Sequence, residues 1–382
     1  MLRQTKLKAL LTLLASTLFA TLVRAETPSC LVDLESGQTI LSEVADERIE
    51  NNSTAGLMVA YTALSLAQQH DEGLEKPVVA LDEKTNNERT PNLADAIEAV
   101  LLANDREAIE RIVHHFGADV RAFVRSMNEE AARLGLAASR FETPFPSDGT
   151  RKNTTTAADT AKLAADLYRR FPFIRIWTSS DSVKFGNRDI ENENFLRQNK
   201  AITGVFAHVD ENAVNGAILA EDPRTNGRTR RLLAISLHEA SKESFAETIT
   251  TLLMRGYRDF ETVRVFKRGD VVGSVPVYKG NKEEIELRTT QDVFVTLTKE
   301  RMLELGERAF SLSIEYNRPI VAPVDKETRI GQLIISVDDR TVATTPLVAA
   351  EDIRRGNFLR RLTDTIKIAI GSKNSRNQEK ND

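Results

Sequence analysis

The residue types that most often bind metals or act as nucleophiles are few and scattered in this chain, which has five histidines and one cysteine. His114 and His115 are adjacent, so on a helix their rings would point about 100° apart and make a poor metal pair. His70 and His238 stand alone. Cys30 cannot form an internal disulfide, and a buried structural thiol is favoured over a lipidation or redox site. No phosphate loop, His-Glu-x-x-His or cysteine cluster is present, so the sequence predicts no metal site and no cofactor.

Residues 1–25 have the pattern of a cleaved secretory signal peptide. Basic residues precede an apolar run over 9–23, which ends in Val23-Arg24-Ala25. A membrane-spanning anchor is the alternative, but the run is short for a bilayer that needs about 20 apolar residues. Residues 1–25 carry four basic and no acidic residues, so their removal takes the formal net charge from −4 to −8. An exported, mildly acidic protein is expected, without the basic face that a nucleic-acid partner requires.

The mature chain changes its pattern at about residue 257. Helical periodicities alternate with strand-like runs over residues 26–257. Short strands separated by turn residues fill 258–350 and predict a small all-β domain. The expected class is therefore α+β. The helices expected in the first part are Leu57–Gln69, Asp95–His115, Val120–Leu134 and Thr156–Arg170, and the strands are 31–32, 39–41, 214–219 and 232–237.

Residues 351–371 include an apolar stripe at i, i+4, i+8 and i+12, which predicts an amphipathic helix. A helix with cations beside its apolar face, and too short to span a bilayer, is suited to a lipid headgroup layer. Docking on the rest of the protein is the other interpretation, and the pattern alone does not decide. Residues 372–382 are expected to form a flexible tail. The residues expected to contact a membrane are Phe358, Leu359, Arg360, Arg361, Leu362, Ile366, Lys367 and Ile370.

Several segments carry a family resemblance through their order and spacing. The stretch from Cys30 to Tyr61 holds Asp33-Leu34-Glu35-Ser36-Gly37, the segment LSEVADER and then Ser53, and AFVRSMNEEAARLGLAASRFETP (122–144) and GYRDFETV (256–263) follow. These segments resemble the serine D-alanyl-D-alanine carboxypeptidases, or low-molecular-mass penicillin-binding proteins. The ending over 346–370 resembles the membrane-anchored members. The resemblance implies a penicillin-binding, β-lactamase-like transpeptidase domain, peptidoglycan as the setting, and a periplasmic location on the outer face of the inner membrane.

The family's chemistry uses three motifs, Ser-x-x-Lys, Ser-x-Asn and Lys-Thr-Gly. In the first, the spacing of three places both side chains on one side of a helical turn, so that the amine reaches the serine hydroxyl. Here the motif is Ser53-Thr54-Ala55-Gly56, which keeps the nucleophile position and lacks the lysine. The alternative for this stretch is structural: Asn52, Ser53 or Thr54 would serve as N-cap of the following helix.

The other two motifs are also incomplete. The second falls on Asn104-Asp105-Arg106, or with a one-residue shift on Ala103-Asn104-Asp105, and neither register has the serine. In the third, Phe206, Ala207 and His208 follow Gly204-Val205 where the resemblance implies lysine, threonine and glycine. No Lys-Thr-Gly or Lys-Ser-Gly occurs anywhere in the chain. The cation that would bind a substrate carboxylate is therefore missing.

Three hypotheses follow from these departures. The leading one is a pseudoenzyme of peptidoglycan metabolism that lies on the membrane and binds a peptidoglycan stem peptide or a cell-wall protein without cleaving D-Ala-D-Ala. The second is an active serine hydrolase with altered machinery around Ser53, with His208 as the base. The sequence assigns no carboxylate to orient that base, and Asp210 is only one of several that could do so. The third is an assembly protein that binds through its β-rich domain.

Overall fold

The computed structural model describes residues 27–79, 90–117, 119–146, 149, 151–199, 201–204, 206–209, 213–223, 229–305 and 310–378, and in the last helix it describes side chains as far as residue 368. The predicted signal peptide, residues 1–25, lies outside this range, as do Val205, Asp210 and the end of the predicted tail.

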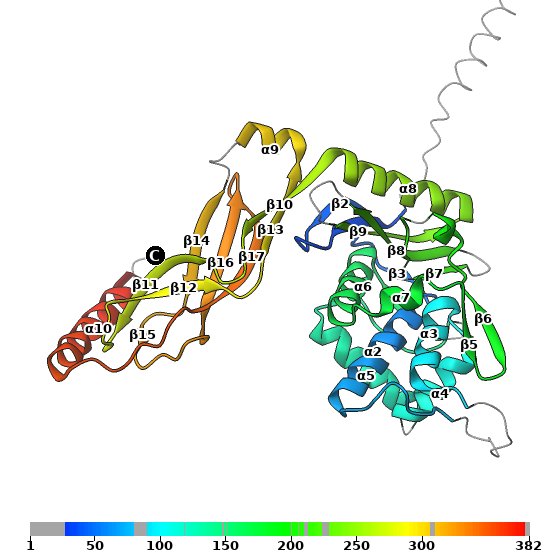
Figure 1. Ribbon diagram of the computed structural model, residues 1–382, viewed down its shortest axis with the longest axis horizontal. Coiled ribbons are helices and arrows are strands. Elements are labelled where there is room, and N and C mark those ends of the chain that lie inside the picture. Colours follow the sequence, from blue (N-terminus) through cyan, green and yellow to red (C-terminus); the bar gives the residue numbers. More distant parts are fainter. Residues whose placement is uncertain are drawn as a thin grey trace, which may run out of the picture.

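Two domains make up the described chain, and they confirm the predicted α+β class (Figure 1). In the first, a five-stranded antiparallel sheet has α8 on one face and the other helices on the opposite face. The strands, in sheet order, are β2 (Thr39–Glu43), β1 (Ser29–Asp33), β9 (Thr229–Glu239), β8 (Val214–Pro223) and β7 (Phe206–Val209). The helices are α2 (Ala55–Gln69), α3 (Leu93–Ala103), α4 (Arg106–Phe116), α5 (Val120–Arg133), α6 (Ala157–Arg170), α7 (Ile174–Thr178) and α8 (Lys242–Asp259). Short elements are β3 (Ile49–Glu50), β4 (Thr154–Thr155), β5 (Ser182–Phe185), β6 (Arg188–Glu191) and η1 (Phe195–Gln198).

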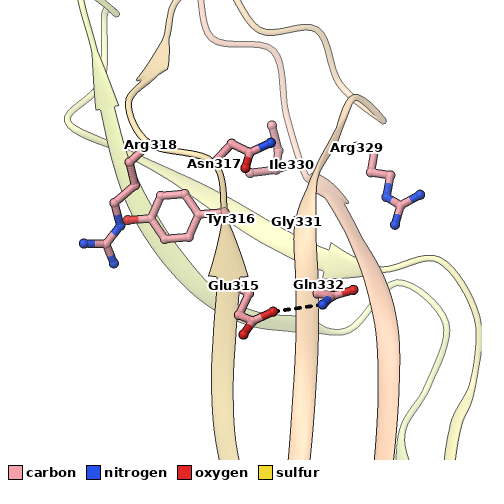
Figure 2. A pocket seen from close by; sticks show the side chains of 8 residues that line it. All are labelled: Glu315, Tyr316, Asn317, Arg318, Arg329, Ile330, Gly331 and Gln332. Carbon is pink, nitrogen blue, oxygen red and sulfur yellow. Dashed lines mark hydrogen bonds between the residues drawn. The ribbon is translucent and has the colours of Figure 1, made fainter. Parts of the chain in front are cut away.

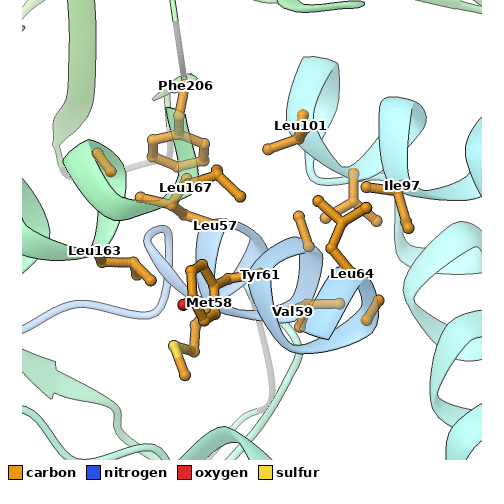
Figure 3. Packing of buried hydrophobic residues seen from close by; sticks show 14 of the residues in the cluster. Leu57, Met58, Val59, Tyr61, Leu64, Ile97, Leu101, Leu163, Leu167 and Phe206 are labelled. Atoms are coloured by element: carbon orange, nitrogen blue, oxygen red, sulfur yellow. The ribbon is translucent and has the colours of Figure 1, made fainter. Parts of the chain in front are cut away.

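Helix α2 is the centre of the first domain. Its sequence, AGLMVAYTALSLAQQ, is apolar nearly all round, and a helix of this kind is stable only when other elements surround it. Figure 3 shows Leu57 and Leu64 of α2 packed among side chains of α3 and α6, with Phe206 of β7 above Leu57. The turn before α2 is consequently held firmly against the sheet. Cys30 lies in the same core, as predicted, and burial raises the pKa of its thiol to about 12.

The helix predicted over Asp95–His115 is two helices, α3 and α4, so that prediction was wrong. Asn104 adopts the left-handed conformation (φ 50°, ψ 35°) and ends α3. Asp105 then caps α4, because its side chain accepts a hydrogen bond from Ala108 N at 2.9 Å. Asparagine tolerates this backbone conformation better than most residues, and aspartate is a favoured N-cap. The chain therefore turns sharply at Asn104, next to the start of α2.

The second domain is all-β apart from one short helix, as predicted. It has a two-stranded sheet, β10–β13, and a six-stranded sheet in the order β14-β16-β17-β12-β11-β15. Its own core includes Ile285, Leu333 and Leu347. The elements are β10 (Phe260–Phe266), β11 (Val271–Tyr278), β12 (Glu284–Thr289), β13 (Val293–Thr298), α9 (Lys299–Leu305), β14 (Ser311–Tyr316), β15 (Ile320–Val321), β16 (Arg329–Val337) and β17 (Arg340–Ala349).

A buried polar network joins the two domains. Asp33, which is fully buried at the end of β1, accepts hydrogen bonds from Arg230 Nε at 2.8 Å and from Thr262 Oγ1 of the β domain at 2.6 Å. Thr262 also contacts Thr296 Oγ1 at 3.0 Å, and Ser36 Oγ reaches the same oxygen at 2.7 Å. Asp33 thus lies at the interface between the two domains and is bonded to residues of both.

Helix α10 (Phe358–Gln378) lies at the far end of the β domain (Figure 1). It begins later than residue 351, because the preceding segment is extended and Ile353 forms a β-bridge with Val324. It continues beyond 371, so residues 372–378 are helical and not part of a tail. No proline interrupts this stretch. None of the described helices is both long and apolar enough to cross a membrane.

The two sides of α10 differ in their contacts. Asp364 is buried and accepts a hydrogen bond from Lys279 N at 2.6 Å. Arg360 Nη2 donates to Lys282 O at 2.7 Å, so Arg360, one of the residues expected to contact a membrane, faces the β domain. Arg360 lies about 200° around the helix from Leu362, just over half a turn. The side chain of Ile370 lies outside the described residues. Phe358, Leu359, Leu362 and Ile366 are between 51% and 74% exposed.

Candidate active site

Ser53 lies in the turn that leads into α2, and only 1% of its surface is exposed. Its hydroxyl accepts a hydrogen bond from Asn215 Nδ2 at 3.3 Å, and its carbonyl accepts one from Asn104 Nδ2 at 2.8 Å. Asn215 is held in turn by Asn51, whose Nδ2 donates to Asn215 Oδ1 at 2.7 Å. Ser53 therefore lies within a set of buried amides and not at an open surface.

The N-cap position of α2 is occupied by one of the expected residues, but the expected capping hydrogen bond is not formed. Thr54 is the N-cap residue, but its side chain makes no capping hydrogen bond. The backbone N–H of Thr54 donates to Asn51 Oδ1 at 3.1 Å, and Asn52 Oδ1 accepts from Asn153 N at 2.7 Å. The start of the helix is thus held by Asn51, two positions before Ser53.

Gly56, at the lysine position of the first motif, is pressed against Asn104. A Cβ atom added to Gly56 would lie 1.6 Å from Asn104 Oδ1 and 3.3 Å from Val100 Cγ1. The Oδ1 atom is buried and makes no hydrogen bond with the residues that the structure describes. The Asn104 side chain therefore occupies the space in which a longer side chain at position 56 would begin.

The third motif lies on β7, the edge strand of the sheet. Phe206 is 3% exposed and packs in the α2 core (Figure 3), while Ala207 faces the other side of the sheet and packs in the α8 core. His208 returns to the α2 side, because alternate strand residues share a face. At the position expected to hold a cation, an aromatic ring is therefore buried in the hydrophobic core.

His208 has a carboxylate partner that the sequence did not reveal. Its Nδ1 lies 2.9 Å from Glu193 Oε2. His208 also stands opposite Asn215 in the β7–β8 register, and directly opposed residues of an antiparallel pair share one face. The imidazole is thus next to the asparagine that contacts the Ser53 hydroxyl.

The structure brings together Ser53, Gly56 and Asn104 through hydrogen bonding and packing, and it connects them to the β7 strand through Asn215. Sequence reasoning missed Asn215 and Glu193. A polar residue within the otherwise apolar run VNGAILA was a usable signal for Asn215, since buried polar side chains need a specific partner. Nothing in the surrounding sequence distinguished Glu193 from other surface acids.

Comparison with known proteins decides the family. Residues 20–213 match the family described as D-alanyl-D-alanine carboxypeptidase (peptidase S11), and residues 260–355 match the domain described as penicillin-binding protein 5, C-terminal domain. The chain belongs to the D-alanyl-D-alanine carboxypeptidase family. The predicted resemblance is therefore confirmed, and one match falls in each domain, the first ending before β8.

Individual relatives of this carboxypeptidase-family chain are distant but nearly full-length. D-alanyl-D-alanine carboxypeptidase DacA of Escherichia coli (strain K12) is 25% identical over 357 residues, covering 88% of this chain and 86% of the relative. DacC of the same organism is 23% identical over 388 residues, covering 94% of each. Penicillin binding protein 5 from Haemophilus influenzae has a TM-score of 0.69 at 21% identity, over 86% of this chain and 98% of that one. The fold is therefore shared along both domains.

Proposed function

We propose that this chain is a D-alanyl-D-alanine carboxypeptidase-like protein of peptidoglycan metabolism that binds a stem peptide or a cell-wall protein and does not hydrolyse D-Ala-D-Ala. One observation carries the proposal: Asn104 Oδ1 lies 1.6 Å from where a Cβ of residue 56 would be. The position from which the family's lysine activates the serine has no side chain, and the side chain of Asn104 fills the space where one would begin.

The surroundings of Ser53 support the same conclusion. Acyl transfer needs an activated hydroxyl that a substrate can reach, and Ser53 is 1% exposed. A terminal carboxylate of the substrate needs a cation, but Phe206 occupies that position and is itself buried. Losing a desolvated charge that pairs with an anion costs about 2–5 kcal/mol. Neither the burial of Ser53 nor the replacement of the cation by Phe206 prevents a ligand from binding to another part of the surface.

Labelling with a fluorescent penicillin tests the loss of catalysis. The purified mature protein is incubated with the reagent beside a Ser53→Ala variant, and folding is checked by circular dichroism. We expect no Ser53-dependent labelling of folded protein. Stoichiometric labelling that disappears in Ser53→Ala would show an activated serine and would end the proposal. Release of D-alanine from a stem pentapeptide, measured with the same pair of proteins, gives an independent answer.

An active serine hydrolase remains the second candidate, and the Glu193–His208 pair favours it. A carboxylate 2.9 Å from Nδ1 is the arrangement that orients a histidine base toward a serine. A fluorophosphonate reagent would then label Ser53, and His208→Ala would abolish labelling while His70→Ala would not. Labelling that is indifferent to His208, or none at all, would remove this candidate.

We also propose export and attachment to a lipid surface through α10. The amino-terminal pattern supports export. On α10, the buried contact of Asp364 leaves the apolar stripe on the exposed side of the helix, where its four large side chains are more than half exposed. A protein that docked this helix on itself would bury that stripe instead.

Vesicle sedimentation tests the attachment. Leu362→Glu places a charge within the stripe, whereas Leu312→Glu makes the same change at an exposed leucine of β14, outside α10. We expect the mature protein and Leu312→Glu to sediment with anionic phospholipid vesicles, and Leu362→Glu to remain in the supernatant. Equal sedimentation of the two variants would exclude the stripe as the lipid contact.

A further inference from the structure

A pocket in the first domain lies well away from Ser53. It has a volume of about 310 Å³ and is formed by the β1–β2 turn, α6, α7 and the start of β9. Asn215, beside Ser53, and Glu221, beside this pocket, are six residues apart on β8, which corresponds to roughly 20 Å along a strand. The residues lining the pocket are Leu34, Glu35, Ala165, Tyr168, Arg169, Pro172, Arg175 and Arg231, and it is named here the Arg231 pocket.

The floor of the Arg231 pocket is apolar. Leu34, Ala165 and Pro172 contribute aliphatic surface. Tyr168 contributes its ring, since its hydroxyl is turned away and donates to Gly204 O. The volume would hold roughly ten water molecules at about 30 Å³ each. Pockets of this size with an apolar floor and a few convergent polar groups are typical of small-molecule sites.

The polar groups of the pocket are mainly guanidinium groups. Arg175 Nη1 and Arg231 Nε approach the same oxygen, Glu221 Oε1, at 2.7 and 3.1 Å, so two cations share one carboxylate. Arg169 is 66% exposed at the mouth, and its Nη1 lies 3.8 Å from Asp166. Because each guanidinium has five N–H donors, these pairs leave donors available for an anion.

The carboxyl group of Glu35 is the one acidic side chain lining the pocket. Its Oε2 accepts a hydrogen bond from Arg231 N at 3.0 Å. Burial raises the pKa of this carboxyl to about 6, although the contacts with Arg231 act in the opposite direction. A perturbed carboxyl beside several cations is common at binding sites.

A larger hollow of about 720 Å³, beside β14 and β16, lacks this convergence. Figure 2 shows Arg318 next to the ring of Tyr316, while Arg329 extends to the other side of the strands. Glu315 and Gln332 are hydrogen-bonded to each other at 2.9 Å. Its arginine side chains therefore do not converge on one place, whereas those of the Arg231 pocket do.

We propose that the Arg231 pocket binds a small carboxylate that carries an apolar body. The body contacts Leu34, Ala165 and Pro172, and the carboxylate pairs with Arg169 and Arg175 at the mouth. Guanidinium groups suit a planar carboxylate because two parallel N–H donors can meet its two oxygens. This site does not depend on the state of Ser53.

Benzoate is a suitable probe, with benzamide as a neutral analogue of similar shape and acetate as an anion without the apolar body. Binding to the mature protein is followed by two-dimensional ¹H–¹⁵N NMR. We expect benzoate to shift the amides of Glu35, Ala165 and Arg231, and to bind at least tenfold more tightly than either analogue. Equal binding of benzoate and benzamide would overturn the proposal.

Single-residue variants test whether benzoate binds in the Arg231 pocket. Arg169→Gln should weaken benzoate binding at least fivefold without affecting folding, because the side chain is largely exposed, and Ala165→Leu should abolish binding by filling the floor. Arg125→Gln removes an exposed arginine beside another cavity and should leave binding unchanged. Ser53→Ala should also leave it unchanged. Full binding in both Arg169→Gln and Ala165→Leu, or equal weakening in Arg125→Gln, would place benzoate elsewhere.

Discussion

Strands β8 and β9 carry two contrasting regions at their opposite ends. At the end that holds Asn215, called here the closed end, the Asn104 side chain fills the space where a side chain at position 56 would begin, and Phe206 is buried in the α2 core. At the other end, beside Glu221 and Arg231, a cavity of about 310 Å³ remains. Among the residues that the structure describes, the motif positions of the family and the Arg231 pocket therefore lie at opposite ends of the same two strands, and the two ends differ in how their side chains are packed.

Among the tests of this contrast, Phe206→Ala has the largest expected effect. Phe206 is buried at the closed end, so its removal should leave a cavity and lower the free energy of unfolding by about 3–5 kcal/mol. Urea denaturation measures the change. Phe173→Ala is the matched control, because Phe173 is 36% exposed, and it should cost well under half as much. Equal costs would mean that the closed end is not tightly packed.

Gly56→Ala tests the contact with Asn104. The added Cβ should destabilise the protein by about 1–3 kcal/mol, since Asn104 must leave its bond with Ser53 O. In an Asn104→Gly background, which keeps the left-handed conformation accessible, the same change should become stabilising through helix propensity. The double-mutant cycle gives the coupling free energy.

Gly73→Ala is the control for that cycle, because its Cβ would meet only the flexible end of Glu75. It should show no dependence on residue 104. Additive effects of Gly56→Ala and Asn104→Gly would contradict the assignment of Asn104 as the group that fills the lysine position.

Glu35→Gln tests the electrostatics of the open end. Burial raises the pKa of Glu35 to about 6 from its ordinary 4.5, so the folded protein holds this proton more tightly than the unfolded chain does. The contribution to stability is complete below pH 4.5 and is lost as the pH rises through 6. Glu35→Gln should therefore match the wild type at pH 4 and exceed it by about 1 kcal/mol at pH 8, after allowance for solvent screening.

Thermal or urea unfolding across this pH range measures the difference, and Glu43→Gln, an exposed position on β2, serves as control. A wild type that is more stable than Glu35→Gln at pH 8 would show that the pairing of Glu35 with Arg231 outweighs the cost of its burial.

The smallest expected effect concerns added volume at the open end. Ala165→Leu extends into the Arg231 pocket and should change the free energy of unfolding by less than about 1 kcal/mol. Ala164→Leu, one position earlier on α6 and fully buried, should cost about 1–3 kcal/mol by overpacking. If the two variants cost the same, the pocket is not available to a side chain and the contrast between the two ends fails.

Much of the fold followed from local patterns. The apolar α2 helix, several strands of both domains and the family resemblance were predicted from residue order and spacing. The break at Asn104 was not, because a long apolar periodicity continues on both sides of it and the left-handed conformation is fixed by the contact with Ser53. Periodicity alone located the stripe of α10, but it did not show that Arg360 turns toward Lys282.

The candidate site was predictable in its positions and not in its contacts. Ser53, Gly56 and Asn104 were identified from the motifs, yet their mutual packing depends on three segments that are distant in sequence. Asn215 and Glu193 became relevant only through strand pairing and a side-chain contact across the fold. A motif can therefore name the residues to inspect, whereas the volume between them requires coordinates.

The position of Asp33 has a consequence for any attempt to divide the chain. Cutting it between α8 and β10 would follow the covalent boundary of the domains, but it would also remove Thr262 from a fully buried carboxylate and Thr296 from Ser36. An amino-terminal fragment ending at residue 259 would thus expose the Asp33–Arg230 pair to water along a surface shaped for another domain. The two domains are distinct in topology, but each contributes to the stability of the other.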